Sequence, residues 1–266
     1  MSRVEEFTLD ISPLTQSPRK IWVYLPNSYD STKKKYDVLY MFDGHNLFYD
    51  EYATYGKSWG IKDFLDKNNI DLVVIGQDCN HIGNARMDEY CPMVSQKTIW
   101  GGEEIVPTGD ITAKWFAEVL KPECEKRYRI YKNRKHVGIA GSSMGGLMSQ
   151  YFITKYNHVY SKAGCVSPAT YFCFKPLMEL IQKTDFEESR IYMDLGSEES
   201  EAKRDLVMRM DMLLQMNHLF TEKGCITYPH LVVDGRHCEA SWETIVPLFI
   251  SFLYPELCKK SVTLTG

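Results

Sequence analysis

The chain has 266 residues, of which 44% are hydrophobic and 25% are charged, and its formal net charge is −4. These proportions are typical of a globular protein and exclude a disordered or fibrous one, and the length suits one large domain. Because the net charge is negative and the lysines and arginines are scattered, we expect neither nucleic acid nor an anionic membrane surface as a partner.

The amino-terminal segment, MSRVEEFTLD, lacks the basic stretch and the apolar core of a signal peptide. Apolar runs nowhere approach the roughly 20 residues that a membrane-spanning helix needs. We therefore expect a cytoplasmic protein. Its eight cysteines are dispersed, which favours free thiols over a disulfide framework. CxxC, HExxH and EF-hand spacings are absent from the sequence, so we expect neither a bound metal nor a cofactor.

Eight short apolar runs of strand length occur along the chain, and longer segments with helical spacing lie between several of them. The predicted strands cover residues 5–11, 20–25, 38–42, 72–76, 136–140, 163–167, 191–195 and 227–233. The predicted helices cover residues 59–67, 111–127, 145–155, 200–223 and 241–253. This alternation predicts an α/β fold, with a mostly parallel eight-stranded sheet covered by helices on both faces, in a single domain spanning residues 1–266.

Two segments depart from the alternation of strands and helices. The first two predicted strands are separated only by a short stretch that contains Pro13 and Pro18, which predicts an antiparallel hairpin at the start of the sheet. Residues 77–109 are irregular and rich in glycine, asparagine, methionine and aromatic residues. We expect this segment to lie over the carboxyl edge of the sheet, where open α/β sheets bind ligands.

The sequence GSSMGG (residues 141–146) follows the fifth predicted strand and precedes a predicted helix. A serine flanked by glycines two positions away on each side, on a turn from strand to helix, is the nucleophile elbow of α/β-hydrolases. Only Ser143 has that spacing, with Gly141 and Gly145, because Ser142 has Ala140 and Met144 at the same offsets. The pattern therefore predicts Ser143 as a catalytic nucleophile.

A serine nucleophile needs a base, and in this fold the chain order is serine, acid, histidine. His237 fits best, since it lies in a loop between the last predicted strand and the final helix. Three other histidines follow the elbow in less suitable places. His158 ends a helical stretch, His218 lies within a helix and His230 lies within a strand, so packing or solvent exposure is expected for them.

The acid is expected after the strand that covers residues 191–195. Several carboxylates occur there, and some of them are expected only because acidic side chains are favourable near the amino terminus of the next helix. Glu199 is the first choice, Glu198 the second, and Asp194, which still belongs to the strand, the third.

Attack on a carbonyl also needs N–H donors for the developing oxyanion. One should be the N–H of Met144, directly after the nucleophile, and the other should come from the loop after the third strand. In that loop Gly44 allows close approach of the backbone, so the N–H of His45 is predicted as the second donor. We assign no catalytic role to the His45 imidazole.

Taken together, several segments resemble the putative esterase family of α/β-hydrolases, which includes enterochelin, feruloyl and acetylxylan esterases, S-formylglutathione hydrolases and mycolyltransferases. The chain is most similar to small cytoplasmic bacterial members of the enterochelin-esterase type. The segments that carry the resemblance are YMFDGHNLF (residues 40–48), Arg86 with EYCP (residues 89–92), LKP (residues 120–122) with Tyr128 and Arg129, the elbow itself, and His237 with ASW (residues 240–242).

The resemblance implies Ser143 as nucleophile, His237 as base and, from a G-x-x-D/E pattern, Glu199 as acid, where the family more usually has aspartate. It also implies hydrolysis of small or aromatic acyl esters of the siderophore, feruloyl or acetyl type through an acyl-enzyme, without a cofactor. An acyltransferase or an S-formylglutathione thioesterase would use the same residues. A protein that has kept the fold but only binds a ligand is the alternative from another class.

Overall fold

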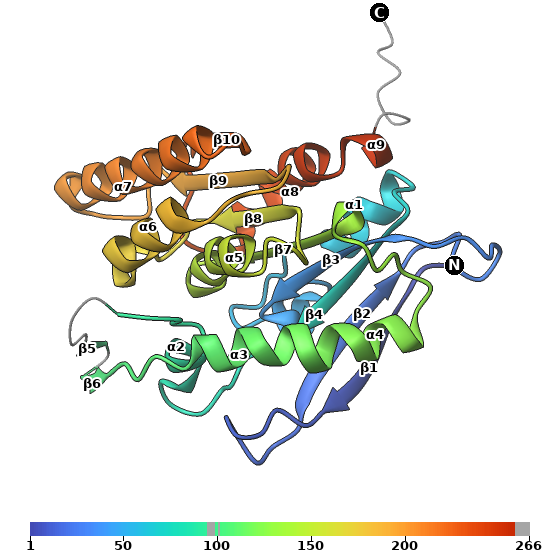
Figure 1. Cartoon of the computed structure of the whole chain (residues 1–266). Coiled ribbons are helices and arrows are strands. Elements are labelled where there is room, and N and C mark those ends of the chain that lie inside the picture. Colours follow the sequence, from blue (N-terminus) through green and yellow to red (C-terminus); the bar gives the residue numbers. More distant parts are fainter. Residues whose placement is uncertain (95–98, 101, 259–266) are drawn as a thin grey trace, which may run out of the picture.

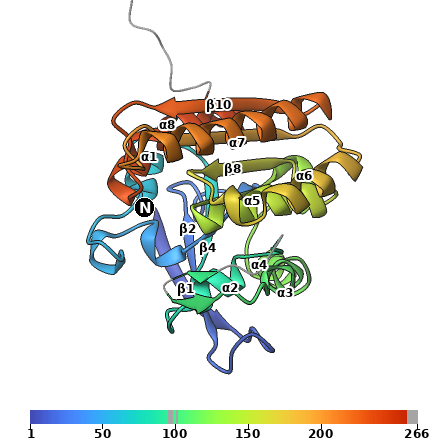
Figure 2. The ribbon, with the colours of Figure 1, turned by 90° about the vertical axis from the view of Figure 1, so that its left-hand side faces the viewer.

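The structure, a computed structural model, describes residues 1–94, 99–100 and 102–258. Its centre is an eight-stranded sheet (Figures 1 and 2). The sheet strands are β1 (Arg3–Leu9), β2 (Arg19–Leu25), β3 (Asp37–Phe42), β4 (Leu72–Gln77), β7 (Val137–Ser142), β8 (Lys162–Val166), β9 (Arg190–Gly196) and β10 (Ile226–Val232). A separate two-stranded ribbon pairs β5 (Ile99–Trp100) with β6 (Glu103–Glu104).

The strand order in the sheet is β1-β2-β4-β3-β7-β8-β9-β10. β1 and β2 form an antiparallel hairpin and β2 pairs antiparallel with β4, whereas the pairs from β4 through β10 are parallel. The carboxyl ends of the parallel strands therefore meet at one edge. In an open α/β sheet this edge is where ligands bind.

Helices cover both faces of the sheet, and Figures 1 and 2 show them in separate layers. The longer helices are α1 (Ile61–Lys67), α3 (Gly109–Trp115), α4 (Lys121–Arg127), α5 (Met144–Lys155), α6 (Phe174–Lys183), α7 (Lys203–Glu222) and α8 (Glu239–Leu253). Shorter helical segments are η1 (Gly44–Asn46), η2 (Asp50–Tyr52), α2 (Ala85–Glu89), η3 (Phe116–Leu120), η4 (Arg134–His136), η5 (Thr170–Phe172) and α9 (Pro255–Cys258).

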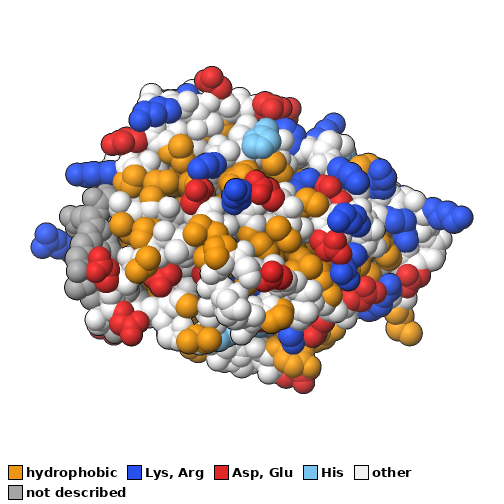
Figure 3. Space-filling model, turned by 60° about the horizontal axis from the view of Figure 1, so that its bottom comes forward, with side chains coloured by type: hydrophobic (Ala, Val, Ile, Leu, Met, Phe, Trp, Pro, Cys, Tyr) orange, Lys and Arg blue, Asp and Glu red, His pale blue; other side chains and the backbone are white. Residues whose placement is uncertain are grey.

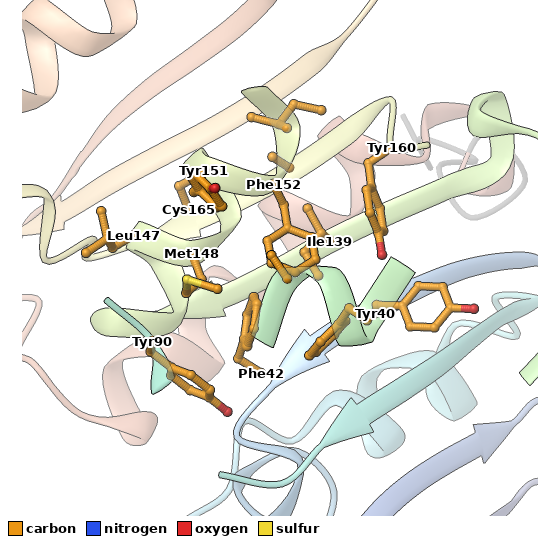
Figure 4. Packing of buried hydrophobic residues seen from close by; sticks show 14 of the residues in the cluster. Tyr40, Phe42, Tyr90, Ile139, Leu147, Met148, Tyr151, Phe152, Tyr160 and Cys165 are labelled. Carbon is orange, nitrogen blue, oxygen red and sulfur yellow. The ribbon is translucent and has the colours of Figure 1, made fainter. Parts of the chain in front are cut away.

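The alternation of side chains along each strand explains why the sheet has two separate cores. In β3, Tyr40 and Phe42 pack with α5, while Leu39 and Met41 belong to the opposite cluster together with α1 and α8. Figure 4 shows the first cluster, in which Phe152 of α5 lies among aromatic rings. Its ring centroid is 5.6 Å from that of Phe42 and 5.5 Å from that of Tyr160.

All eight predicted strands are confirmed, with ends that differ by a few residues, and the predicted hairpin is the β1–β2 pair. The predicted helices are also present. Helix α6 was not predicted, although Leu177 and Ile181 lie four residues apart and are both buried, as expected of a helix with one apolar face. All eight cysteines are free thiols, as predicted.

The helix predicted over residues 111–127 is continuous but not uniform. It starts as α3, widens into a π-helical turn at η3 and continues as α4. Pro122 lies at the beginning of α4. Because a proline ring clashes with the carbonyl four residues earlier and donates no hydrogen bond, the wider turn accommodates it inside an otherwise regular helix.

The surface mixes charges of both signs. On the face shown in Figure 3, basic and acidic side chains are interspersed with apolar ones, and no large area carries a single sign of charge. Within the described residues, none of the helices combines the length and the apolar character needed to cross a membrane.

Replacing Phe152 with alanine tests the packing of the first core. The phenylalanine is fully buried, so Phe152→Ala should lower the free energy of unfolding by about 3–5 kcal/mol. Val207→Ala, at an exposed position of α7, is the control, with an expected change within about 0.5 kcal/mol. Urea denaturation followed by circular dichroism measures both, and equal effects of the two substitutions would contradict this description of the core.

Candidate active site

Ser143 occupies the turn between β7 and α5. β7 ends at Ser142 and α5 begins at Met144, so the chain reverses direction within one residue. The backbone of Ser143 has φ 57° and ψ −119°, a conformation that a residue with a side chain rarely adopts. Ser142 is instead a buried residue of the strand. The structure thus separates the two serines as their spacing from the glycines predicts.

The glycines on either side of Ser143 are required by close packing. A Cβ atom on Gly141 would lie 2.9 Å from the carbonyl carbon of Gly145. A Cβ atom on Gly145 would lie 2.9 Å from the Cβ of Phe42. Both separations are shorter than van der Waals contact, so the sharp turn can form only with glycine at these two positions.

His237 and Glu199 come from the loops that follow β10 and β9. The Nδ1 atom of His237 lies 2.9 Å from Oε2 of Glu199. The Glu199 side chain is only 1% exposed, whereas that of His237 is 38% exposed. The pair therefore consists of a buried carboxylate and an imidazole that remains accessible from the solvent side.

The other acids considered for this position lie elsewhere. Glu198 is exposed. Asp194 is buried in β9 and accepts hydrogen bonds from the Ser167 N–H at 2.8 Å and the Tyr192 hydroxyl at 2.9 Å. Of the three candidates, Glu199 is the one that the fold brings into contact with His237.

Glu199 is held as a carboxylate by its hydrogen bonds. Burial acts to raise its pKa, but the hydrogen bond with His237 and those from the Ser167 hydroxyl and the Gly196 N–H keep the pKa below its usual value. The carboxylate is therefore charged at neutral pH and can stabilise a protonated imidazole beside it.

Trp242 supports both Glu199 and His237, a role that was not predicted from the sequence. Its indole N–H donates to the Ser167 hydroxyl at 3.0 Å, and that hydroxyl donates to Glu199. The Trp242 ring also meets the His237 ring edge to face, with centroids 5.1 Å apart. The only sequence signal was its membership of the segment that carries the family resemblance.

The loop after β3 forms the short helical turn η1, and the residue just before this turn has a left-handed backbone conformation. Asp43, just before η1, has φ 56° and ψ 53°. A bidentate ion pair with Arg86 holds its carboxylate, with N···O distances of 2.8 and 2.7 Å. Burial acts to raise the pKa of Asp43, but the guanidinium outweighs this and the pKa is lowered. The pair ties the loop to α2, in the irregular segment, and was not predicted.

The two predicted oxyanion donors lie at the starts of helical turns. Met144 is the first residue of α5, and His45 is the second residue of η1. The first N–H groups of a helix have no acceptor within the helix, which leaves them available to another group. The Met144 side chain itself is buried in the core.

Glu239, two residues after His237, links the loop after β3 to α8. Its Oε1 accepts a hydrogen bond from the Asn46 side-chain amide at 3.0 Å, and its Oε2 has no hydrogen-bond partner among the described residues. Burial, with a contribution from the Asp43 charge, raises its pKa. This contact was also missed, because nothing in the local sequence relates residues that are so far apart in the chain.

A cavity of about 280 Å³ joins these groups. Ser143, His237 and the η1 residues His45 and Asn46 line it, and the indole of Trp242 forms an aromatic wall. Most of the other lining residues are polar: Asp43, Thr54, Tyr55, Cys79, Asn80, His81, Arg86, Ser142 and Glu239. Part of the irregular segment therefore lies over the carboxyl edge of the sheet, as predicted. Residues 95–98 and 101 of that segment lie outside the described residues.

Four side chains beside the cavity carry atoms that could bind a metal ion. They belong to His45, Asp78, Cys79 and His81, and their ligand atoms all lie within 4.8 Å of one another. The spacing of these residues in the sequence matches neither CxxC, HExxH nor the EF-hand.

Asp194 gives the stability of this region a pH dependence of known sign. Burial raises its pKa to about 7 from an ordinary 3.8, against the lowering effect of its hydrogen bonds. The folded protein therefore keeps a proton on Asp194 that the unfolded chain releases. The stabilisation of the folded state by this proton is fully present below pH 3.8 and is lost as the pH rises through 7.

The substitution Asp194→Asn should remove this pH dependence, because asparagine does not titrate. Its side-chain oxygen can still accept the hydrogen bond from the Ser167 N–H. Chemical denaturation between pH 4 and 8 should show that the difference in unfolding free energy between wild type and variant shifts in favour of the variant as the pH rises. A difference that stays constant over this range would mean that Asp194 is ionised in the folded protein.

Comparison with known proteins agrees with the predicted resemblance. The sequence matches the family described as "Putative esterase" over residues 12–247. The uncharacterized protein YbbA of Bacillus subtilis (strain 168) is 26% identical over 214 residues, which cover 77% of this chain and 79% of that protein.

Several solved structures have a similar fold. An IroE-like serine hydrolase from Shewanella oneidensis superposes with a TM-score of 0.74 at 16% identity, covering 99% of this chain and 83% of that one. An S-formylglutathione hydrolase from Agrobacterium tumefaciens superposes with a TM-score of 0.65 at 15% identity, covering 96% of each chain. The fold is thus the α/β-hydrolase fold, and the chain belongs to the putative esterase family.

Proposed function

We propose that this protein hydrolyses carboxylic esters through an acyl-enzyme formed on Ser143, with His237 as base and Glu199 as the acid that orients it. The observation that carries the proposal is the contact of 2.9 Å between the buried Glu199 carboxylate and His237 Nδ1. His237 lines the same cavity as Ser143, which lies on a strained turn. Family membership supports ester hydrolysis in general.

The first step joins the substrate to the serine. Because Glu199 accepts the proton on His237 Nδ1, Nε2 is left as the basic nitrogen, and it takes the proton of the Ser143 hydroxyl as the oxygen attacks the ester carbonyl. The resulting imidazolium then protonates the leaving alcohol. In the second half, His237 removes a proton from water, the hydroxide attacks the acyl-enzyme, and the proton returns to Ser143 as the acid leaves.

The oxyanion formed in each half is stabilised by the N–H groups of His45 and Met144. Their fixed positions matter, because donors that need no rearrangement during the reaction stabilise the charge most. The Asp43–Arg86 ion pair and the hydrogen bond from Asn46 to Glu239 hold the loop that carries the His45 N–H. These residues act through the loop, so we assign them a positioning role.

The cavity favours small or aromatic acyl esters. Its volume of about 280 Å³ is small for a drug-sized ligand, and its lining combines the Trp242 wall with many polar groups. Ferulic acid esterases and siderophore hydrolases occur among proteins of similar structure, which supports testing such esters first.

An acyltransferase would differ only in the acceptor of the acyl group, and a thioesterase only in the leaving group. A protein that merely binds a ligand would not need the contact between Glu199 and His237.

Replacing the nucleophile tests the proposal. Ser143→Ala should lower kcat/KM for an aryl acetate by about 10³-fold or more, because no acyl-enzyme can form. Ser149→Ala, which removes a buried hydroxyl from the same helix, is the matched control and should retain most of the activity. Unchanged hydrolysis by Ser143→Ala protein would refute the proposed nucleophile.

Two adjacent glutamates offer a matched test of the acid. Glu199→Gln should lower kcat on the order of 10²- to 10⁴-fold, because an amide neither stabilises the imidazolium nor fixes its tautomer. Glu198→Gln changes the same chemical group one residue away, on the exposed side of the loop, and should have little effect. Steady-state kinetics on both variants, with melting temperatures as a check of folding, measures this. A larger loss in Glu198→Gln would reassign the acid.

A further inference from the structure

The side chains of His45, Asp78, Cys79 and His81 form a cluster next to the proposed catalytic groups, and none of these four side chains takes part in the proposed reaction. Oδ1 of Asp78 lies 2.6 Å from Nδ1 of His45 and 3.1 Å from Nε2 of His81. The Cys79 sulfur lies 4.0 Å from the same Nε2. Two segments distant in the chain, the η1 turn and the loop after β4, thus bring two imidazoles, a carboxylate and a thiol to one point.

We propose that these four side chains form a zinc site beside the cavity. Zinc binds histidine, cysteine and carboxylate in tetrahedral sites, and bonds of about 2.0–2.3 Å place its ligand atoms about 3.3–3.8 Å apart. The ligand atoms of the cluster are all within 4.8 Å of one another. Small side-chain rotations therefore suffice to open the hydrogen bonds of Asp78 around an ion, and no backbone rearrangement is needed.

The charge of the cluster matches a divalent ion. Two neutral imidazoles, the Asp78 carboxylate and the Cys79 thiolate carry two negative charges, which a divalent cation neutralises. The thiol loses its proton to solvent when the metal–sulfur bond forms. The nearby Arg86 does not oppose the ion, since its charge is already balanced by Asp43. The presence of sulfur and nitrogen ligands favours zinc over magnesium or calcium, which prefer oxygen.

A further contact of His45 supports its role as a metal ligand. Its second ring nitrogen, Nε2, lies 3.0 Å from the hydroxyl oxygen of Thr54. A histidine that binds a metal through one nitrogen commonly donates the N–H of the other to an acceptor, which fixes the tautomer and the ring orientation. Thr54 can supply that acceptor when Nδ1 of His45 binds the ion.

Four protein ligands leave no open position on a tetrahedral ion, so the site is structural. The ion would tie the η1 turn to the loop after β4. His81, with a side chain that is 58% exposed, is the ligand most easily removed without disturbing the core. These statements do not depend on the proposed hydrolase function.

Cobalt(II) is the probe that tests the site, because its spectrum reports both geometry and sulfur ligation. The full chain, treated with a chelator and dialysed, should bind one equivalent of Co²⁺. We expect intense visible bands of a tetrahedral ion and a near-ultraviolet sulfur-to-cobalt band, and we expect Zn²⁺ to displace the cobalt and to raise the melting temperature. Absence of saturable binding at micromolar metal, or the weak spectrum of an octahedral ion, would overturn the proposal.

Variants identify the ligands. Cys79→Ser should abolish the sulfur band, and both Cys79→Ser and His81→Ala should weaken zinc binding by about 100-fold or more, which exceeds the usual effect of changing a group outside the first ring of ligands. His218→Ala removes an exposed histidine of α7 and should leave binding unchanged. Equal zinc affinity in all four proteins would locate the metal elsewhere and overturn the assignment. Because these readouts are spectroscopic, they remain informative even where no ester is hydrolysed.

Discussion

The strained turn at Ser143 is the constraint on which the rest of the site depends. β7 must end and α5 must begin within one residue, and this forces a backbone conformation that is unfavourable for serine. Dense packing around the turn offsets the unfavourable backbone energy of Ser143, because Gly141 lies against Gly145 and Gly145 lies against Phe42. Any side chain at either glycine would push the helix away from the sheet. The position of the hydroxyl is thus a consequence of core packing and not of the loop alone.

The other groups reach Ser143 because the fold gathers loops at one sheet edge. The loops after β3, β4, β9 and β10 all contribute residues to the cavity or to the groups that support it. Contacts between these loops are then made by polar pairs that each contain a buried carboxylic acid side chain: Glu199 with His237, Asp43 with Arg86, and Glu239 with Asn46. The buried Glu199 and Asp43 carboxylates are stabilised as charged groups by these hydrogen-bonding partners. The same gathering of loops creates the cluster that we infer to bind zinc.

The sequence alone predicted the strands, the elbow and the position of His237, because these depend on local patterns: apolar runs, glycine spacing and chain order. Among three candidate acids it ranked Glu199 first, and the preference over Glu198 came from the G-x-x-D/E pattern of the family resemblance. The direction of the loop after β9, which brings Glu199 into contact with His237, is visible only in the structure. It missed the partners Asp43 and Arg86, which meet across 43 residues of chain. A metal was not expected, because the cluster around Cys79 has no recognisable spacing and arises only in three dimensions.

In the proposed mechanism, His237 activates Ser143 for attack on the substrate. Reaction with a fluorophosphonate, followed by peptide mapping of the labelled residue in wild-type and His237→Ala protein, tests it most directly, because it requires no knowledge of the natural substrate. We expect rapid, stoichiometric labelling of Ser143 in the wild-type protein, and labelling that is lost or greatly slowed without the histidine. Folded protein that remains unlabelled, or that is labelled on another residue, would contradict it.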